Sequence, residues 1–577
     1  MKRWYKYIKP YLPFFIIGPL CMIVEVIGEV LMPKYLATII NQAKAGTLTV
    51  GGSIGVAGLM ILTALLMMAG GVGGAYFGGK ASVNFAADLR ADVYAKVQKF
   101  SFANIDNFSS SSLVTRLTND VTQVQNIVNM ALRMLLRSPG MLIGGLIMAI
   151  SLKPSLSVVF AVTIPLMLIS VISIIRVGFP RFSRMQTKID ALNSTVQENI
   201  TNMRVVKSFV REDFEKDKFA AANKDLKDSG MSAMRVMIFM SPVMTLFMNL
   251  TILAVIFFGG QIVLDFGMDI GDLSAFITYV SQILSSLMMV TFMFMMSSRA
   301  IASGKRICEV LDEKLDIDDE NAKYPEKLVN SGDIEFRGVS FRYYKSSEEP
   351  VLDNINIKIR SGATVGIIGS TGCGKTTLVS MIPRLYDTDS GEVLVDGVNV
   401  RDYSLRNLRE GVGMVLQKNV LFSGTIEENL RWGDEHASAE ELTAAARSAQ
   451  ADKFVRDFTH GYQTELGQGG VNVSGGQKQR LCIARALLKK PKILILDDST
   501  SAVDTATEAQ IRSAFKNELA SSTKIVIAQR ITSVADADMI IVMSDGKITG
   551  VGTHDELLAS NEEYREIYES QTGKAAV

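Results

Sequence analysis

The 577-residue sequence is poor in cysteine and histidine, with four cysteines and three histidines in the whole chain. Cys21, Cys308, Cys373 and Cys482 stand far apart, without the paired spacing of a zinc site or a disulfide framework, so we expect buried or reduced thiols. An excess of charge is also absent, because 60 lysines and arginines balance 59 aspartates and glutamates. A polyanionic partner such as a nucleic acid is therefore not expected.

A cleavable leader is also not expected at the N-terminus. The stretch MKRWYKYIKPYLPFF contains no short apolar segment with a small-residue cleavage site. Its basic residues lead directly into a long apolar run, which we interpret as a retained membrane span. No peptidase segment precedes this run, which disfavours an exporter that processes peptides.

Long apolar runs are abundant, and the mean hydropathy of the chain is +0.22. Six runs reach the roughly 20 residues that a helix needs to cross a bilayer. They lie near 13–33, 55–79, 131–152, 155–177, 238–262 and 273–298. Lys2, Arg3, Lys6 and Lys9 precede the first run and favour a cytoplasmic N-terminus. The even number of spans returns the chain to the same side.

The segments 80–130 and 178–237 then lie in the cytoplasm, where their helical spacing of apolar residues predicts helices that continue beyond the membrane. The composition changes near residue 315, and short β-branched runs alternate with helical patterns from Ile334 onward. We predict an α-helical six-span membrane domain at 1–315, a polar linker at 316–332 and an α/β P-loop nucleotide-binding domain at 333–577.

The clearest chemical motif is GSTGCGKTT, which follows the predicted strand TVGII and precedes a predicted helix. It matches G-x-x-x-x-G-K-[ST], whose glycines let backbone N–H groups wrap the β-phosphate of ATP. Lys375 is expected to contact the β- and γ-phosphates, and Thr376 to ligate Mg²⁺. The predicted nucleotide contacts in this loop are Gly369, Ser370, Thr371, Gly372, Cys373, Gly374, Lys375, Thr376 and Thr377.

Two further elements fit a nucleotide site. Asp497 ends the hydrophobic run KILILD, where a carboxylate can hold the Mg²⁺ shell. Between this strand and the phosphate loop lies VSGGQKQR, in which a serine and two glycines open a helix and form a second anion-binding N-terminus. Helix capping alone would also explain the serine and the glycines.

The phosphate loop, SGGQ and the acid after a strand together resemble the ATP-binding cassette (ABC) transporters, and the membrane half resembles their six-span exporter type. The first and second cytoplasmic loops of that family correspond to SSSSLVTRLTNDV and MRVVKSF in this sequence. The segment ELGQGG resembles the part of the family's nucleotide-binding domain that contacts the coupling helices. The resemblance implies that Tyr343 stacks on adenine, although Tyr344 stands where the family usually has proline. It implies that Gln417 senses Mg²⁺ and the attacking water.

Two cassettes of this family meet head to tail, so each chain contributes to two sites. The resemblance implies that Ser474, Gly475, Gly476 and Gln477 contact the ATP held by a partner chain, and that Asp504, at the end of SAVD, communicates across the dimer. It also implies the cofactors ATP and Mg²⁺.

The sequence departs from the family at two catalytic positions. Asp498 stands where the family has its general-base glutamate, and Gln529 where it has a histidine; none of the three histidines follows that strand. Aspartate is shorter than glutamate by one methylene, which draws its carboxylate back by about 1.5 Å. Because hydrogen-bond contact with the attacking water requires about 2.6–3.2 Å, this retreat matters for catalysis. Glutamine can donate a hydrogen bond but cannot carry a positive charge or shuttle a proton. We predict that ATP still binds and that hydrolysis is slow.

The intact signature beside a weakened site favours a heterodimer with a second ABC half-transporter that supplies the standard glutamate and histidine. A homodimer, with two impaired sites, is the alternative. Absence of a targeting segment favours the bacterial cytoplasmic membrane, with the N-terminus and the nucleotide-binding domain in the cytoplasm. Expected partners are therefore this second chain, the bilayer and a small-molecule substrate.

The transported compound is less evident. Methionine suits promiscuous apolar surfaces, and the last two spans are rich in it, although lipid-facing or packing roles explain the same residues. These side chains are Met237, Met240, Met244, Met248, Met288, Met289, Met293, Met295 and Met296, with Phe292 and Phe294 among them.

Glu25 and Glu29 lie at membrane depth, one helical turn apart, where acids are costly. They either face a cavity that favours cationic compounds or pair with Arg133 or Arg137. Export of hydrophobic drug-like compounds by alternating access is the leading hypothesis. Peptide or lipid export, import, and an ATP-gated regulatory membrane protein are alternatives.

Overall fold

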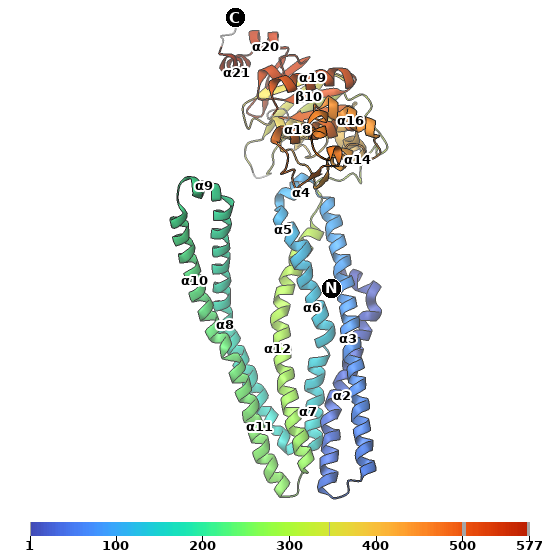
Figure 1. Cartoon of the computed structure of the whole chain (residues 1–577), viewed down its shortest axis with the longest axis vertical. Helices are drawn as coiled ribbons and strands as arrows, with labels where there is room; N and C mark the ends of the chain where they lie inside the picture. The colour runs from blue at the N-terminus through green and yellow to red at the C-terminus, as the bar shows by residue number, and fades with distance from the viewer. Residues whose placement is uncertain (1, 345–346, 499–502, 574–577) are drawn as a thin grey trace. The chain divides into compact units, whose positions relative to one another are not determined.

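The structure is a computed structural model that describes residues 2–344, 347–498 and 503–573. Contacts divide the chain into two compact units (Figure 1). Unit 1 comprises Met1–Lys96 and Ser111–Asp312, and unit 2 comprises Val97–Ser110 and Glu313–Val577. The predicted boundaries at 315 and 332 stay a prediction.

Unit 1 is built of helices, which run from blue to yellow-green in Figure 1. They are α1 (Lys2–Ile8), the 3-10 helix η1 (Lys9–Tyr11), α2 (Leu12–Lys44), α3 (Val50–Gln98), α5 (Ser110–Thr115), the π-helix η2 (Arg116–Asp120), α6 (Val121–Met134), α7 (Arg137–Leu152), α8 (Pro154–Thr201), α9 (Met203–Ser208), α10 (Glu212–Ile238), α11 (Met240–Leu264) and α12 (Ile270–Asp312).

Six helical segments of the described chain are long and apolar enough to cross a membrane. They are Arg3–Lys44, Val50–Gln98, Ser110–Leu152, Pro154–Thr201, Glu212–Leu264 and Ile270–Val290. The six predicted spans are confirmed. The predicted helices in 80–130 and 178–237 are also confirmed, because α3, α8 and α10 extend well past the apolar runs.

The third predicted span, 131–152, lies within the segment Ser110–Leu152, whose helix is interrupted inside the predicted span. Residues Leu135 and Leu136 form a turn between α6 and α7. Pro139 favours a break at this point, since it lacks the N–H that would bond to the carbonyl of Leu135. Prolines inside α2 and α8 nevertheless leave those helices continuous.

Small residues let α2 and α3 approach each other closely. A Cβ atom at Gly70 would lie 2.7 Å from the carbonyl oxygen of Cys21, and one at Gly74 would lie 2.6 Å from the terminal methyl of Met22. Such contacts are typical of membrane helices, whose association depends on close packing instead of the hydrophobic effect. Any larger residue at Gly70 would force the two backbones apart.

Unit 2 contains a six-stranded sheet in the order β12-β11-β3-β10-β9-β6, a four-stranded sheet in the order β2-β1-β4-β5, and the pair β7-β8. The strands are β1 (Ile334–Phe341), β2 (Leu352–Ile359), β3 (Thr364–Gly369), β4 (Ser390–Val395), β5 (Val398–Asn399), β6 (Val412–Val415), β7 (Gly424–Thr425), β8 (Glu465–Leu466), β9 (Ile493–Asp497), β10 (Thr523–Ile527), β11 (Met539–Ser544) and β12 (Lys547–Gly552).

The six-stranded sheet is parallel except for β12 at its edge. The helices of unit 2 are α4 (Phe102–Asn107), α13 (Lys375–Ser380), α14 (Leu405–Gly411), α15 (Ile426–Arg431), α16 (Ala439–Ser448), α17 (Asp452–Arg456), α18 (Gly475–Leu488), α19 (Thr505–Glu518), α20 (His554–Ser560) and α21 (Glu562–Thr572), with the 3-10 helices η3 (Val400–Asp402), η4 (Gly461–Gln463) and η5 (Ile531–Ser533). Strands buried on both faces read as continuous apolar runs, and every residue of β9 is buried. The predicted fold class is confirmed.

Helix α4 belongs to unit 2 although the sequence places it among the membrane helices. The amide of Asn104, which is fully buried, donates to Glu313 Oε1 at 3.2 Å and to the carbonyl oxygen of Lys314 at 2.9 Å. The hydroxyl of Tyr386 donates to Asp106 Oδ2 at 3.2 Å. These polar contacts, distant in sequence, carry no periodic signal and could not be predicted from apolar patterning.

Candidate nucleotide-binding site

The candidate site lies at the carboxyl ends of three parallel strands. Strand β10 pairs with β3 on one side and with β9 on the other, so Ile527 stands opposite both Ile367 and Asp497. The loop after β3 begins the phosphate-binding motif, and the residues after β9 and β10 include Asp498 and Gln529. Open parallel sheets place ligand sites at this edge.

The phosphate loop is shaped by glycine. Gly374 precedes α13 with φ of +97°, a conformation that disfavours residues with a Cβ atom. A Cβ atom at Gly369 would lie 2.1 Å from the carbonyl oxygen of Met543. Lys375 Nζ donates to the carbonyl oxygens of Gly369 and Ser370 at 2.9 and 2.7 Å. Backbone carbonyls of its own loop therefore hold the ammonium group of Lys375.

Other side chains of the loop differ in exposure. Ser370 and Thr371 are exposed, as is the glycine that follows them, Gly372, whereas Cys373 and Thr377 are buried. The hydroxyls of Ser370 and Thr371 are thus accessible to a ligand, and Cys373 packs into the domain core.

Thr376 and Asp497 form the candidate magnesium site. The Thr376 hydroxyl donates to Asp497 Oδ1 at 3.0 Å, while Asp497 Oδ2 is buried and has no hydrogen-bond partner among the described residues. Burial raises the pKa of the Asp497 carboxyl, reinforced by the charge of Asp498 and opposed by the Thr376 bond and Lys375. A buried carboxylate oxygen without a partner beside a hydroxyl fits Mg²⁺, which prefers oxygen ligands.

The three predicted catalytic side chains meet around Asp498. Gln529 Nε2 donates to Asp498 Oδ2 at 2.7 Å. Burial raises the pKa of the Asp498 carboxyl, while hydrogen bonds from Gln529 and Gln417 and the charge of Lys375 oppose the rise. Asp498 also adopts φ of +47°, which is uncommon for a residue with a Cβ atom. Asp498 and Gln529, the two predicted departures from the family, thus form a direct contact.

Tyr343, not Tyr344, contacts the phosphate-loop helix. The hydroxyl of Tyr343 is 2.9 Å from Thr377 Oγ1, and its ring packs edge-on against Tyr386 with centroids 5.2 Å apart. Tyr344 is 67% exposed. The position of Tyr343 beside the loop supports its choice as the adenine-stacking residue, which stays a prediction.

The signature residues and Asp504 serve as helix caps within this chain. Ser474 Oγ accepts from the Gln477 backbone N–H at 3.3 Å, and Gln477 Oε1 accepts from the Ser474 backbone N–H at 2.9 Å. This capping box begins α18 and leaves Ser474 and Gly475 exposed, next to Gly476. Asp504 caps α19 through the Thr507 N–H, and the neighbouring Ser501 and Ala502 lie outside the described residues.

Sequence reasoning missed the residues that hold the main chain around Asp498 and Gln529. Gln479 Nε2 donates to the carbonyl oxygen of Asp498 at 3.4 Å, and Gln571 Nε2 donates to that of Gln529 at 2.7 Å. Arg512 Nη1 donates to the carbonyl oxygen of Thr532 at 2.8 Å. Gln571 and Arg512 lie in helices outside every short motif, so no local pattern indicates them.

In unit 1, the pairing alternative for the membrane acids is confirmed. Arg137 Nη2 lies 3.2 Å from Glu25 Oε1 and 3.1 Å from Glu29 Oε2. Gln282 Nε2 from α12 donates to the carbonyl oxygen of Glu29 at 3.0 Å. One guanidinium therefore joins two carboxylates between α2 and α7.

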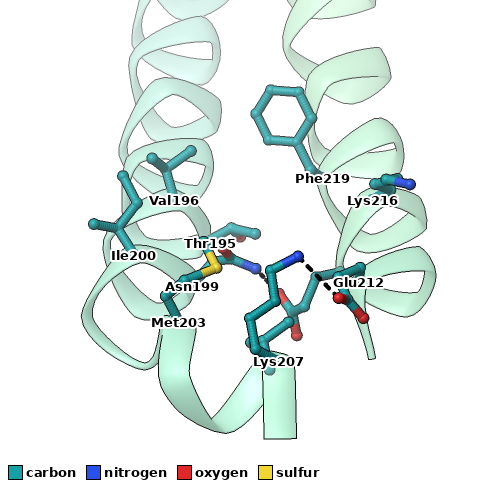
Figure 2. Close-up of a pocket in the computed structure, with 11 residues that line it drawn as sticks. Thr195, Val196, Asn199, Ile200, Met203, Lys207, Glu212, Lys216 and Phe219 are labelled. Carbon is teal, nitrogen blue, oxygen red and sulfur yellow. Dashed lines mark hydrogen bonds and ion pairs between the residues drawn. The ribbon is translucent and has the colours of Figure 1, made fainter. Parts of the chain in front are cut away.

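The segment MRVVKSF forms α9 and the turn after it, beside a cavity of about 460 Å³ between α8 and α10 (Figure 2). Polar contacts close its end: Lys207 Nζ pairs with Glu212 at 2.9 Å, and Asn199 donates to Glu215 at 3.1 Å. Phe209 and Val210, directly after α9, are 74% and 81% exposed.

A P-loop domain attached to six membrane-crossing helices defines the class of this chain as a multi-pass membrane protein with a nucleotide-binding domain. Family comparison is specific: the ABC transporter transmembrane region matches residues 15–287, and the ABC transporter domain matches residues 352–501. The chain belongs to the ABC transporter family, and its second unit is the ATP-binding domain of that family.

Relatives match along nearly the whole chain. The uncharacterized ABC transporter ATP-binding protein YfiB of Bacillus subtilis is 39% identical over 578 residues, covering 100% of this chain and 99% of that protein. The ATP-dependent lipid A-core flippase of Syntrophus aciditrophicus is 33% identical over 485 residues. The match covers 84% of this chain and 80% of that protein. The solved structure of a bacterial Atm1-family ABC exporter with ATP bound has a TM-score of 0.81 at 24% sequence identity. The match covers 98% of this chain and 99% of that structure's chain. The fold is that of ABC exporters.

Asp497→Asn tests the candidate magnesium site. The substitution keeps the side-chain shape but removes the charge, so Mg²⁺-dependent nucleotide binding should weaken at least about tenfold, with metal-free binding retained. Burial raises the pKa of Asp497, so protons should compete with Mg²⁺ as pH falls through that pKa, and Mg²⁺ should bind better above it. The variant should lose this pH dependence.

The measurement is binding of a fluorescent ATP analogue to the full-length chain during Mg²⁺ titrations at mildly acidic and neutral pH. Thr376→Ser, which retains the hydroxyl, serves as the matched control and should bind normally. Unchanged Mg²⁺ dependence in Asp497→Asn would show that this carboxylate does not hold the metal.

Proposed function

We propose that this chain is one subunit of an ATP-driven exporter, that its own ATP site hydrolyses slowly, and that its signature completes a faster site on a partner chain. The contact between Gln529 and Asp498 carries the proposal. It ties the candidate base to an uncharged amide at the position where the family has a histidine.

Binding and catalysis separate in this site. Lys375 would neutralise phosphate charge, and Thr376 with Asp497 would hold Mg²⁺, which bridges phosphate oxygens and stabilises charge that develops during phosphoryl transfer. Asp498 would orient the attacking water, but its short side chain and the Gln529 amide restrict its reach. The chain therefore keeps nucleotide affinity and loses rate.

The intact signature in a chain with two departures at its own site favours a heterodimer over a homodimer. Ser474 and Gly475 begin α18 at the surface, and their capping box leaves the helix N-terminus preformed without a ligand. A preformed element that acts only on a partner's ATP is useful if that partner has an intact base and switch residue. A homodimer would place every signature opposite an Asp498 and Gln529 pair.

The membrane unit supports export of hydrophobic compounds. Closure of two cassettes on ATP would move the membrane helices between inward- and outward-facing states, from the cytoplasmic side of a bacterial cytoplasmic membrane. Several methionines have packing roles, because Met244 is buried in the helix core and Met240 and Met248 pack against it. Met288 and Met289 are 40% exposed and are better candidates for substrate contact.

The side chains of Phe292, Phe294, Met295 and Met296 lie outside the described residues. Lipid export is the second candidate function, and the relative named as a lipid A-core flippase favours it. A lipid and a hydrophobic drug share an apolar body, so the methionine-rich helices suit either.

Restoring the family residues tests the slow site. Asp498→Glu with Gln529→His should raise ATP turnover of the purified full-length chain in nanodiscs about 100-fold, because a correctly placed base contributes roughly that factor. Adding Lys375→Ala to this background should abolish the gain and serves as the control for a contaminating ATPase. Turnover by the unaltered chain that equals the restored variant would contradict a slow site.

Glu25→Gln tests whether the membrane acids bind substrate. Because Arg137 also pairs with Glu29, the variant keeps one ion pair, and transport of a lipophilic fluorescent cation into inverted vesicles should stay within about twofold of the native rate. Arg137→Met should instead lower the yield of folded protein, because it leaves two acids unpaired. Selective loss of cation transport in Glu25→Gln, with a neutral substrate unaffected, would restore the cation-binding alternative.

A further inference from the structure

The segment that carries Gln529 is fastened to the C-terminal helix of the chain. Gln571, near the end of α21, makes two hydrogen bonds to it through one side-chain amide. Its Nε2 donates to the carbonyl oxygen of Gln529 at 2.7 Å, and its Oε1 accepts from the backbone N–H of Ile531 at 2.8 Å. One side chain thus fixes the main chain on both sides of Arg530.

Helix α21 packs against this segment through its own apolar side chains, so the backbone of Gln571 is held in place. Tyr564 is fully buried in a small core with Ala528, Ile531 and Val534, and its hydroxyl lies 2.7 Å from His554 Nδ1. Ile567 and Tyr568 pack against the same core. The apolar contacts hold the helix, and the Gln571 amide transmits its position to the main chain of Gln529.

The opposite end of the segment has a separate support. Arg512 in α19 donates to the carbonyl oxygen of Thr532 at 2.8 Å. At the start of the segment, the side chain of Gln529 reaches Asp498 Oδ2 at 2.7 Å. A displacement of about 1 Å at a catalytic group can cost roughly 100-fold in rate, so the main-chain attachments matter for the chemistry.

We propose that Gln571 is a positioning residue for the ATP site: its amide holds the backbone of Gln529 and Ile531 so that residue 529 meets residue 498. The proposal rests on the proposed function only in assigning nucleotide chemistry to this pair. Gln571 does not touch the reacting atoms, and it acts through the main chain, so it should serve any side chain placed at 529.

The direct test is hydrogen exchange in the full-length chain, followed by mass spectrometry of peptides spanning Ala528–Val534. Gln571→Ala removes both bonds, so exchange of the Ile531 amide should accelerate about tenfold, the factor that one lost hydrogen bond supports. Gln571→Glu keeps an acceptor for the Ile531 N–H and loses the donor to Gln529, so protection should persist. Ser570→Ala, the exposed neighbour, should exchange like the native chain. Native exchange in Gln571→Ala would overturn the proposal.

The kinetic test uses the Asp498→Glu, Gln529→His background, where turnover is measurable. Gln571→Ala should lower kcat about tenfold with the KM for ATP unchanged, and Gln571→Glu should be intermediate. A fall in melting temperature with kcat retained would show that Gln571 only stabilises the fold, and would overturn the proposal. If the background itself shows no gain in turnover, the slow-site proposal fails, while the exchange test still shows whether Gln571 fixes the main chain at Ile531.

Discussion

The parallel pairing of β10 with both β3 and β9 is the constraint on which the candidate site depends. It places Ile527 opposite both Ile367 and Asp497, so the loops after three strands open at one edge. The phosphate loop then begins beside Asp497, and Thr376 reaches its carboxylate at 3.0 Å. A one-residue slip in this register would turn Asp497 to the other face of the sheet.

The same edge explains why binding and hydrolysis can be separated within one site. The predicted nucleotide contacts come from the loop after β3 and from Asp497, which carry the residue types that the chemistry of ATP and Mg²⁺ requires. The predicted catalytic pair comes from the residues that follow β9 and β10, and Gln529 there contacts Asp498 directly. Changes at the ends of two strands can thus slow hydrolysis without disturbing the loop that holds phosphate.

Sequence reasoning predicted the features that follow a local pattern. The length of the apolar runs predicted the six spans, and the glycine-rich motif predicted the phosphate loop with Thr376. It placed the third span at 131–152 from hydropathy, which carries no signal for the turn at Leu135 and Leu136 that comes before Pro139. It left Arg133 and Arg137 open as partners of the membrane acids. The rotation of the helices, which decides that Arg137 is the partner, cannot be predicted from the sequence. The contacts of Asn104 and Gln571 join distant segments and have no local signal.

The proposed asymmetric transporter would also account for a signature helix that is capped and exposed in a chain whose own site we propose to be slow. The most direct measurement is gentle purification of the tagged chain from its native membrane, with mass spectrometry of whatever remains bound at equal stoichiometry. The account predicts a second six-span ABC chain that carries glutamate and histidine at the positions of Asp498 and Gln529. Recovery of this chain alone as a dimer, with rapid ATP turnover, would contradict it.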